Sequence, residues 1–436
     1  MISPYGAMRT HGAGTLRVEH DGQDVAVAGW IDTRRDHGGV VFLDLRDRSG
    51  TVQVVVDPAS GAEQPNDGSS DRGGTSLEQA HRLRSQYVVR VEGTVRRRPE
   101  GMDNPSLATG EVEVHAADLE VLSTADTPPF PVEDGIEVDE TLRLRHRYLD
   151  LRRPEMQRIL RLRAATTSVI RRVMERHGFV EVETPVLTRA TPEGARDFLV
   201  PARLQPGSTY ALPQSPQLFK QLLMVAGLER YYQIARCFRD EAHRADRQAE
   251  FTQLDVELSF GDEEDVYALV EELFAEIWRE VLGVELDTPF PRMAYAEAMR
   301  RYGTDKPDLR FGMELADLSD VFSATEVGVF RGALDAGGAV VAVTVDGGGD
   351  LSRKDLDGWV EWAKRWGARG LAWGIVEGDG SLRSPLAKFM SDTEAKGLRE
   401  ITGAEPGDAV FVGAGARPDV RELMGALRLA VAKARH

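Results

Sequence analysis

The chain has 436 residues, a formal net charge of -17 at pH 7 and a hydrophobic fraction of 42%. This length predicts about two to four domains with packed cores. The single cysteine, Cys237, excludes an internal disulfide and a cysteine-rich zinc site, and it fits a reducing compartment such as the cytoplasm. The sequence has neither a signal-like start nor an apolar run of about 18 residues, so we expect neither secretion nor membrane spanning.

The region 15–123 contains five short strand-like segments, with a helical stretch between the third and the fourth. This order is typical of a small oligonucleotide-binding (OB) barrel. The acidic net charge argues against binding nucleic acid by bulk attraction, since phosphate contacts need local Lys and Arg. Residues 81–98 provide such a basic run, although a solvated strand edge is an alternative explanation for it.

Composition shifts divide the chain into five parts. A proline-rich segment after the barrel predicts an extended hinge, and the pattern then turns helical before strand-like and helix-like pieces alternate. The expected parts are a flexible tail at 1–14, an OB barrel at 15–125, a hinge at 126–150, a second domain at 151–310 and a third at 311–430.

The third domain begins with a strand-like run and continues with an amphipathic helix. Ser352 and Asp355, three residues apart, predict a capping box at the start of that helix. A second strand follows, so the pattern indicates a small strand-helix-strand unit. The overall prediction is a multidomain α+β protein whose third domain is α/β.

Residues 231–260 predict a β-hairpin with an unusual density of charge. Strand alternation places Arg239 on one face of the first strand, and Phe251, Gln253 and Asp255 on one face of the returning strand. The planar fork of Arg239 suits a phosphate or a carboxylate, and Phe251 suits a purine ring. The alternative is a surface hairpin whose charges form only weak pairs.

An upstream segment supplies complementary groups. Gln217 and Lys220 are three residues apart at a predicted helix start and share one face. Together with Glu193 they provide a carboxylate, an amide and an ammonium group, which is a plausible receiver for a zwitterion. Helix capping and a snorkelling lysine remain the alternative.

At these residues the chain resembles bacterial-type aspartyl-tRNA synthetases, which are class II aminoacyl-tRNA ligases. The matching segments are residues 177–201, 211–224 and 231–260. Residues 30–57 are similar to the anticodon-binding OB barrel of that family, and residues 347–391 to the domain inserted in bacterial members.

The resemblance implies an antiparallel class II catalytic sheet and an ATP site on the hairpin. Arg239 is implied to bind both the ATP α-phosphate and the α-carboxylate of the substrate. Glu241 and Gln248 are implied to contact ATP, and Phe251 to stack on adenine. The implied reaction converts L-aspartate and ATP to aspartyl-adenylate and pyrophosphate, and then transfers aspartate to tRNA(Asp).

The resemblance also implies how aspartate is held. Glu193 and Gln217 would hold its amino group, while Lys220, helped by Gln253 and Asp255, would bind its side-chain carboxylate. Lys220 argues against the related asparagine enzyme, because a cation suits a carboxylate better than an amide.

Several tRNA contacts follow from the same resemblance. Arg244 and Arg247 in the hairpin loop are expected near the acceptor end. Phe42 would stack on an anticodon base that Gln53 hydrogen-bonds, although burial in the barrel core is an alternative for Phe42.

Arg34 and Arg35 are expected near the anticodon backbone. His37 resembles members that charge both tRNA(Asp) and tRNA(Asn), so tRNA(Asn) is a second expected partner. The segment around Pro185 matches the first catalytic motif, which implies a homodimer.

A third catalytic motif is not recognised in the sequence. We therefore expect a catalytic domain that is incomplete in this chain, with the ligands of Mg²⁺ in the missing part and no metal ligand assigned here. A non-catalytic tRNA-binding protein that keeps the barrel and the dimer surface is the alternative function.

Overall fold

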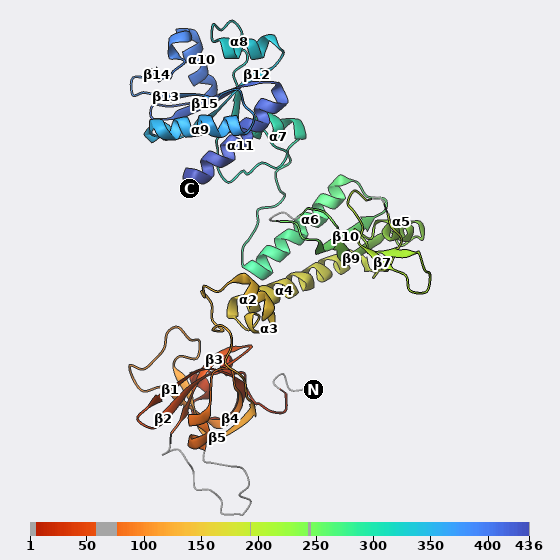
Figure 1. The fold of residues 1–436 in the computed structure, drawn as a ribbon, viewed down its shortest axis with the longest axis vertical. Coiled ribbons are helices and arrows are strands. Elements are labelled where there is room, and N and C mark those ends of the chain that lie inside the picture. The colour runs from red at the N-terminus through yellow and green to blue at the C-terminus, as the bar shows by residue number, and fades with distance from the viewer. Residues whose placement is uncertain (1–5, 58–75, 192, 243–245, 436) are drawn as a thin grey trace, which may run out of the picture. The chain divides into compact units, whose positions relative to one another are not determined.

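The computed structural model forms two compact units, Met1–Thr288 and Pro289–His436, which are described separately (Figure 1). It describes residues 6–57, 76–191, 193–242 and 246–435. The expected tRNA contact Arg244 lies outside these ranges. Within these ranges every helix is too short or too polar to cross a bilayer.

The first unit begins with a closed five-stranded barrel in the order β1-β2-β3-β5-β4. Val41, Leu43 and Leu45 of β2 are fully buried inside it, so the residues between them face outward. The predicted helix lies between β3 and β4. The elements are η1 (Ala13–Thr15), η2 (Val18–His20), β1 (Asp24–His37), β2 (Val40–Asp47), β3 (Gly50–Val56), α1 (Ser76–Arg82), β4 (Val88–Arg97) and β5 (Val112–Ser123).

Residues 9–14, which we expected within a flexible tail, pack on the barrel instead. The Thr10 amide donates to the Ala26 carbonyl oxygen at 2.8 Å, and Ala13 is fully buried. Gly14 lies so close to the Ser49 backbone that a Cβ atom would meet the Ser49 carbonyl oxygen at 2.2 Å. Small and polar residues allow this close approach, although their composition is typical of a disordered end.

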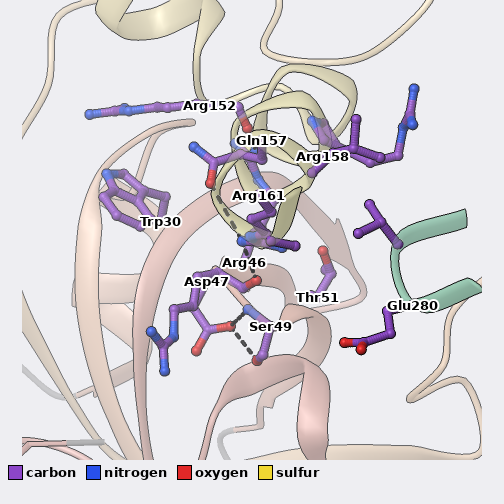
Figure 2. Close-up of a pocket in the computed structure, with 16 residues that line it drawn as sticks. Trp30, Arg46, Asp47, Ser49, Thr51, Arg152, Gln157, Arg158, Arg161 and Glu280 are labelled. Atoms are coloured by element: carbon purple, nitrogen blue, oxygen red, sulfur yellow. Dashed lines mark hydrogen bonds between the residues drawn. The ribbon is translucent and has the colours of Figure 1, made fainter. Parts of the chain in front are cut away.

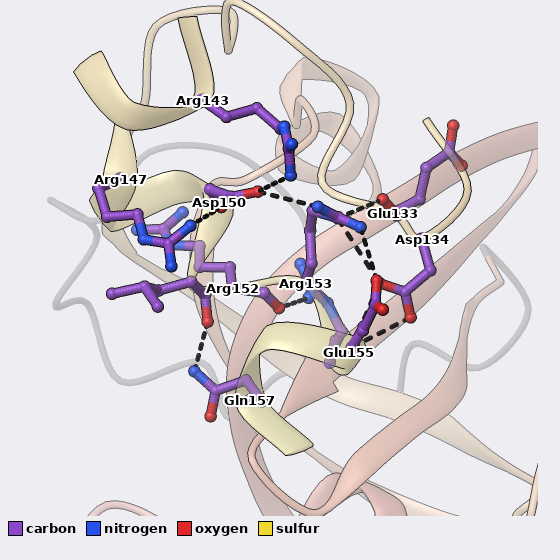
Figure 3. A network of polar contacts seen from close by, with 11 residues as sticks. Glu133, Asp134, Arg143, Arg147, Asp150, Arg152, Arg153, Glu155 and Gln157 are labelled. Atoms are coloured by element: carbon purple, nitrogen blue, oxygen red, sulfur yellow. Dashed lines mark hydrogen bonds and ion pairs between the residues drawn. The ribbon is translucent and has the colours of Figure 1, made fainter. Parts of the chain in front are cut away.

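The predicted hinge contains two short helices, α2 (Glu140–Arg145) and α3 (Arg147–Asp150). Figure 3 shows the Asp150 carboxylate between arginine side chains. Arg153 Nη1 donates to Asp150 Oδ1 at 2.9 Å, and Arg153 Nε donates to the Glu133 carbonyl oxygen at 2.9 Å. Because Asp150 is fully buried, these bonds hold the hinge against the helix that follows.

The rest of the first unit is built around a small sheet in the order β10-β9-β6. β9 and β10 pair antiparallel, as predicted, whereas β6 pairs with β9 in parallel. One face of the sheet packs on α4 and α6 through apolar side chains. The elements are α4 (Pro154–Arg176), β6 (Val180–Glu181), β7 (Leu199–Pro201), β8 (Thr209–Ala211), α5 (Gln217–Val225), β9 (Arg230–Phe238), β10 (Glu250–Leu258), α6 (Glu263–Ile277) and η4 (Trp278–Leu282).

The second unit is an antiparallel sheet, β11-β12-β15-β13-β14, with helices on both faces (Figure 1). The capping box at Ser352 and Asp355 is confirmed. The predicted strand-helix-strand unit is β12-α9-β13, but β15 lies between its two strands. The elements are α7 (Tyr295–Tyr302), β11 (Leu315–Asp317), α8 (Gly328–Asp335), β12 (Ala339–Val345), η5 (Gly348–Asp350), α9 (Arg353–Arg365), β13 (Ala372–Val376), β14 (Leu382–Arg383), η6 (Ala387–Phe389), α10 (Asp392–Thr402), β15 (Ala409–Gly415) and α11 (Arg417–Arg435).

The segment before β11 belongs to this second unit because α11 holds it. Arg428 of α11 is fully buried, and its guanidinium donates to the carbonyl oxygens of Asp308 and Phe311 at 2.7 and 3.0 Å. The same guanidinium lies 4.1 Å from the centroid of the Phe311 ring, a cation–π contact. The predicted start of the third domain at residue 311 therefore excludes Asp308, which Arg428 binds.

Candidate active site and nucleic-acid interface

The β9–β10 hairpin separates an apolar face from a polar face. The antiparallel register places Asp255 opposite Gln233, Gln253 opposite Ala235, and Phe251 opposite Cys237. Directly paired residues share a face, so this polar face lies opposite the apolar core on α4 and α6. The predicted alternation of side chains between the two faces of the hairpin is therefore present in the structure.

Lys220 reaches this polar face from the first turns of α5. Its Nζ atom donates to Asp255 Oδ1 at 3.0 Å and lies 3.4 Å from Glu257 Oε2. Lys220 and Asp255 are both only 9% exposed. Burial raises the pKa of Asp255, the bond and charge of Lys220 oppose that shift, and the charge of Glu257 adds to it.

Arg239 follows β9 and lies on the same face as Lys220. Its guanidinium carbon is 5.1 Å from the centroid of the Phe251 ring, and its backbone amide donates to Ala249 at 2.9 Å. Arg239 Nε and Asp255 Oδ2 are buried, and neither has a hydrogen-bond partner among the described residues. Leaving such groups unpaired is costly, so a polar ligand that bonds them would be stabilised.

Glu193 and Gln217 are connected through a residue that we did not predict. Ser215 Oγ donates to Glu193 Oε2 at 2.8 Å and accepts from the Gln217 backbone amide at 3.3 Å. Thr191 Oγ1 donates to the other oxygen of Glu193 at 3.3 Å. The charge of Glu193 also contributes to the raised pKa of Asp255, which places Glu193 near the same face.

Cys237 lies in the middle of the polar face but is not an activated thiol. Burial raises the pKa of Cys237 to about 11, and the nearby Arg239 charge only partly opposes this effect. The thiol donates to Gln253 Oε1 at 3.1 Å. Its contribution is therefore to orient the Gln253 amide, and chemistry at this face does not need it as a nucleophile.

The hairpin loop leaves two predicted ATP contacts in solvent. Glu241 and Gln248 are both exposed. Glu241 Oε2 lies 3.7 Å from Arg247 Nη1, an exposed ion pair that contributes little. Both side chains are exposed in this structure, and their contact with ATP stays a prediction.

Two further polar residues of the hairpin, Glu257 and Gln233, are candidate site residues that the sequence patterns did not single out. Glu257 lies on the Asp255 face by strand alternation, which was the available signal. Gln233 accepts from the Tyr231 hydroxyl at 2.8 Å and from Thr184 Oγ1 at 2.9 Å. Thr184 is remote in sequence, so no local pattern indicates that pair.

A second polar surface lies on the outside of the barrel. Phe42 of β2 is half-buried, points away from the apolar core and lies opposite Arg35 of β1. The His37 ring lies 6.1 Å from the Phe42 ring in an edge-to-face arrangement. Core burial is therefore not the explanation for Phe42, and the exposed side of its ring is open to stacking.

The arginine pair expected at this surface is divided between the two faces of β1. Arg35 Nη2 donates to Asp44 Oδ1 at 2.9 Å and to Gln53 Oε1 at 3.3 Å. Burial raises the pKa of Asp44, and the charge of Arg35 opposes the shift. Arg34 instead donates to the His81 carbonyl oxygen of α1 at 2.7 Å, away from Phe42.

A cavity of about 590 Å³ lies elsewhere, between the barrel and α4 (Figure 2). Its walls include Trp30 and Arg46 of the barrel, and Arg152 and Arg161 around the start of α4. Arg46 Nη1 donates to the Arg152 carbonyl oxygen at 2.7 Å. None of the predicted site residues with described positions lines this cavity, so it is not the candidate active site.

Among the residues whose positions are described, no group of three or more His, Cys, Asp and Glu side chains could hold a metal ion. We therefore assign no residue to Mg²⁺.

Comparison with known proteins decides the family. Residues 139–403 match the family described as tRNA synthetases class II (D, K and N). The chain belongs to this family. Residues 25–122 match the OB-fold nucleic acid binding domain, so the predicted fold class and the enzyme family are confirmed.

The sequences of relatives of this synthetase align with nearly all of the chain. An aspartate–tRNA(Asp/Asn) ligase of Thermobifida fusca is 56% identical over 426 residues, covering 98% of this chain and 70% of the relative. The ligase of the same name from Saccharopolyspora erythraea is 55% identical, covering 97% of this chain and 67% of the relative. These matches do not support the expectation of an incomplete catalytic domain, and they do not favour the non-catalytic alternative.

A solved structure shares the fold. Asparaginyl-tRNA synthetase from Pyrococcus horikoshii, complexed with asparaginyl-adenylate, superposes with a TM-score of 0.53 at 22% identity. The match covers 94% of this chain and 93% of that one. At this identity the similarity concerns the fold alone.

Proposed function

We propose that this synthetase activates L-aspartate with ATP and transfers it to tRNA(Asp) and tRNA(Asn). The names of the Thermobifida and Saccharopolyspora relatives support the amino acid and both tRNAs. The observation that carries the proposal is that Lys220 and Arg239 contact the same face of the hairpin, Lys220 at Asp255 and Arg239 at Phe251.

The chemical problem is to bring two anions together. An oxygen of the aspartate α-carboxylate attacks the α-phosphorus of ATP, and the bond from that phosphorus to the bridging oxygen of pyrophosphate breaks. Arg239 offsets the repulsion between the two reactants and the charge that develops on the phosphoryl oxygens. Phe251, whose ring lies next to the guanidinium, is the proposed stacking surface for adenine.

Selection of aspartate follows from the charges around Lys220. The side-chain carboxylate of aspartate binds the Lys220 ammonium, while Glu193 and Gln217 take the α-ammonium group. Asp255 and Gln253 orient these partners from β10. Lys220 already contacts Asp255 and Glu257, and an asparagine side chain would offer it a neutral amide in place of a third carboxylate, so we expect the site to prefer the acid.

ATP is the proposed co-substrate, and members of the family use Mg²⁺ with it. Mg²⁺ bound with a nucleotide needs only one or two protein carboxylates beside the phosphates, and no such ligand is assigned among the described residues. Glu241 and Gln248, whose side chains are exposed, remain proposed ATP contacts.

The barrel is proposed to hold the anticodon loop. Phe42 stacks on one base and Gln53 hydrogen-bonds it, while Arg35 lies beside them. His37, in contact with Phe42, is the proposed link to tRNA(Asn), and Arg247 is proposed near the acceptor end. Arg34 is the weakest of the proposed contacts, because its guanidinium is already bonded to α1.

Two further expectations belong to the proposal. The resemblance around Pro185 supports a homodimer, which sedimentation of the purified protein would test. The lone cysteine, Cys237, is free and buried, which fits a reducing compartment and supports a cytoplasmic location.

Aspartate-dependent exchange of pyrophosphate into ATP tests the activity without tRNA. We expect exchange with aspartate and none above background with asparagine. A folded protein that shows no exchange with aspartate would contradict the proposal, and equal exchange with asparagine would contradict the role of Lys220.

A further inference from the structure

The cavity between the barrel and α4 has a positively charged wall that the hairpin site does not use (Figure 2). Its volume of about 590 Å³ is within the range of small-molecule sites. Like charges around one hollow repel one another, so an anion inside the cavity would be stabilised. The arginines that line it are Arg46 and Arg48 on the barrel side, and Arg152, Arg158 and Arg161 around the start of α4.

The protein itself neutralises little of this positive charge. Among the described residues, Arg46 Nη2 lies 3.3 Å from Asp32 Oδ1, and the other four arginines of the wall form no ion pair. Arg161 instead donates to the Arg48 carbonyl oxygen at 2.7 Å, which is a neutral acceptor. The cavity therefore keeps an excess of positive charge in the folded protein.

The two acids of the wall, Asp47 and Glu280, are paired with arginines that do not line the cavity. Asp47 Oδ2 accepts from Arg9 Nη1 at 2.9 Å, and the Glu280 carboxylate accepts from Arg172 Nη2. Neither acid is therefore free to neutralise the arginines of the wall. Burial and the charge of Arg46 lower the pKa of Arg152, which is the direction expected where positive charges crowd together.

Much of the remaining wall is apolar. Trp30 contributes an aromatic ring from the barrel, and the Arg152 guanidinium carbon lies 5.2 Å from the centroid of that ring. Leu162 and Ala165 of α4 and Val281 of η4 contribute aliphatic groups. The phosphodiester backbone of a nucleic acid would leave these apolar groups unused. A flat ring with an anionic substituent would use both the apolar and the basic parts of the wall.

We propose that this cavity binds a small organic phosphate with a flat apolar body, either an aryl phosphate or a nucleoside monophosphate. Arg158 and Arg161, one turn apart on α4, hold the phosphate, because planar guanidinium groups suit its oxygens. The ring packs against the apolar part of the wall. The site is separate from the hairpin face, so the inference goes beyond the proposed function.

The test is calorimetric titration of the full chain with 1-naphthyl phosphate. We expect one saturable site with a dissociation constant below about 1 mM. Inorganic phosphate lacks the ring and is expected to bind at least about tenfold more weakly. Equal affinity for the two ions would overturn the apolar part of the site. The absence of saturable binding of 1-naphthyl phosphate up to about 5 mM would overturn the whole inference.

Arg158 and Arg161 are exposed, so both can be changed without loss of a packed side chain. The double variant Arg158→Gln with Arg161→Gln is expected to weaken binding of 1-naphthyl phosphate at least about tenfold, since it loses two charge-assisted contacts. Arg163→Gln is the matched control, because Arg163 of α4 donates to Thr252 at 2.8 Å and does not line the cavity. It is expected to keep the wild-type affinity. Unchanged affinity in the double variant, with or without weaker binding of tRNA, would overturn the inference.

Arg239→Ala separates this site from the hairpin. This variant is expected to bind 1-naphthyl phosphate with wild-type affinity, whereas a loss of affinity would place the ligand on the hairpin and overturn the inference. AMP titrated into the same variant distinguishes the two sources of the ligand. Binding tighter than that of 1-naphthyl phosphate supports a nucleotide, and weaker binding supports an aryl phosphate without a ribose. Pyrophosphate exchange enters none of these measurements, so failure of the inference is distinguishable from failure of the proposed function.

Discussion

The hairpin and the barrel both present polar groups on the open face of a β-sheet, but they satisfy these groups differently. On the hairpin, Arg239 Nε and Asp255 Oδ2 are buried and have no hydrogen-bond partner among the described residues, while Lys220 bridges two carboxylates. On the barrel, the Gln53 amide is bonded at both ends, and Glu113 at both oxygens. The hairpin is thus arranged to gain bonds when charged reactants bind, whereas the barrel holds a fixed pattern for recognition.

The largest effect is expected at Arg239. Arg239→Ala removes the guanidinium that faces the reacting groups, so aspartate-dependent pyrophosphate exchange should fall by about 100- to 1000-fold. Arg236→Ala is the matched control, because Arg236 lies on the opposite face of the same strand and pairs with Glu250 at 3.1 Å. Equal losses of pyrophosphate exchange in the two variants would contradict the assignment of the reacting groups to the Arg239 face of the hairpin.

Lys220 should affect both catalysis and stability. Lys220→Met is expected to raise the KM for aspartate at least about 30-fold, since it leaves a substrate carboxylate without its cation. It also leaves Asp255 buried without its cation, which should lower the free energy of unfolding by about 3 to 5 kcal/mol. Exchange kinetics and urea unfolding measure the two effects.

A double variant separates these two contributions. Lys220→Met with Asp255→Leu replaces the ion pair by apolar groups, so stability should return toward the wild type while exchange stays low. Recovery of exchange together with stability would show that Lys220 acts only as a structural partner.

Phe42 is expected to have a smaller effect, confined to the other region. Phe42→Ala removes a stacking surface from the barrel and should weaken tRNA binding by about tenfold. Pyrophosphate exchange, measured without tRNA, should be unchanged. Unchanged tRNA affinity would contradict the assignment of Phe42 to base stacking.

The smallest effect is expected at Arg34. Its guanidinium is committed to the His81 carbonyl oxygen, so Arg34→Ala should change tRNA affinity by less than about twofold. Arg35→Ala removes the neighbour of Gln53 and should weaken binding more. Filter binding at fixed salt compares the two, and a larger loss for Arg34→Ala would place the RNA on the α1 side of the barrel.

Local sequence patterns predicted several of the side-chain positions at the hairpin. Strand alternation placed Phe251, Gln253 and Asp255 on one face of the returning strand, because a two-residue period survives any tertiary context that keeps the strand. Helical spacing likewise predicted Gln217 and Lys220 at the start of one helix. These are short-range relations, and the structure preserves them.

Contacts between segments that are distant in the sequence could not be predicted in this way. Gln53 and Glu113 meet because β3 pairs in parallel with β5, a pairing that nothing within either strand indicates. The position of β15 between β12 and β13, and the attachment of residues 308–313 to Arg428, depend on similar long-range packing. Sequence reasoning therefore found the reactive groups more readily than the residues that hold them.

Lys220 and Arg239 are proposed to hold one ligand from the same face of the hairpin. Calorimetric titration with a non-hydrolysable aspartyl-adenylate analogue tests it most directly. We predict that the wild type binds the analogue, that Lys220→Met and Arg239→Ala each lose most of that affinity, and that Arg236→Ala retains it. Binding of the analogue with wild-type affinity by both Lys220→Met and Arg239→Ala would contradict the account.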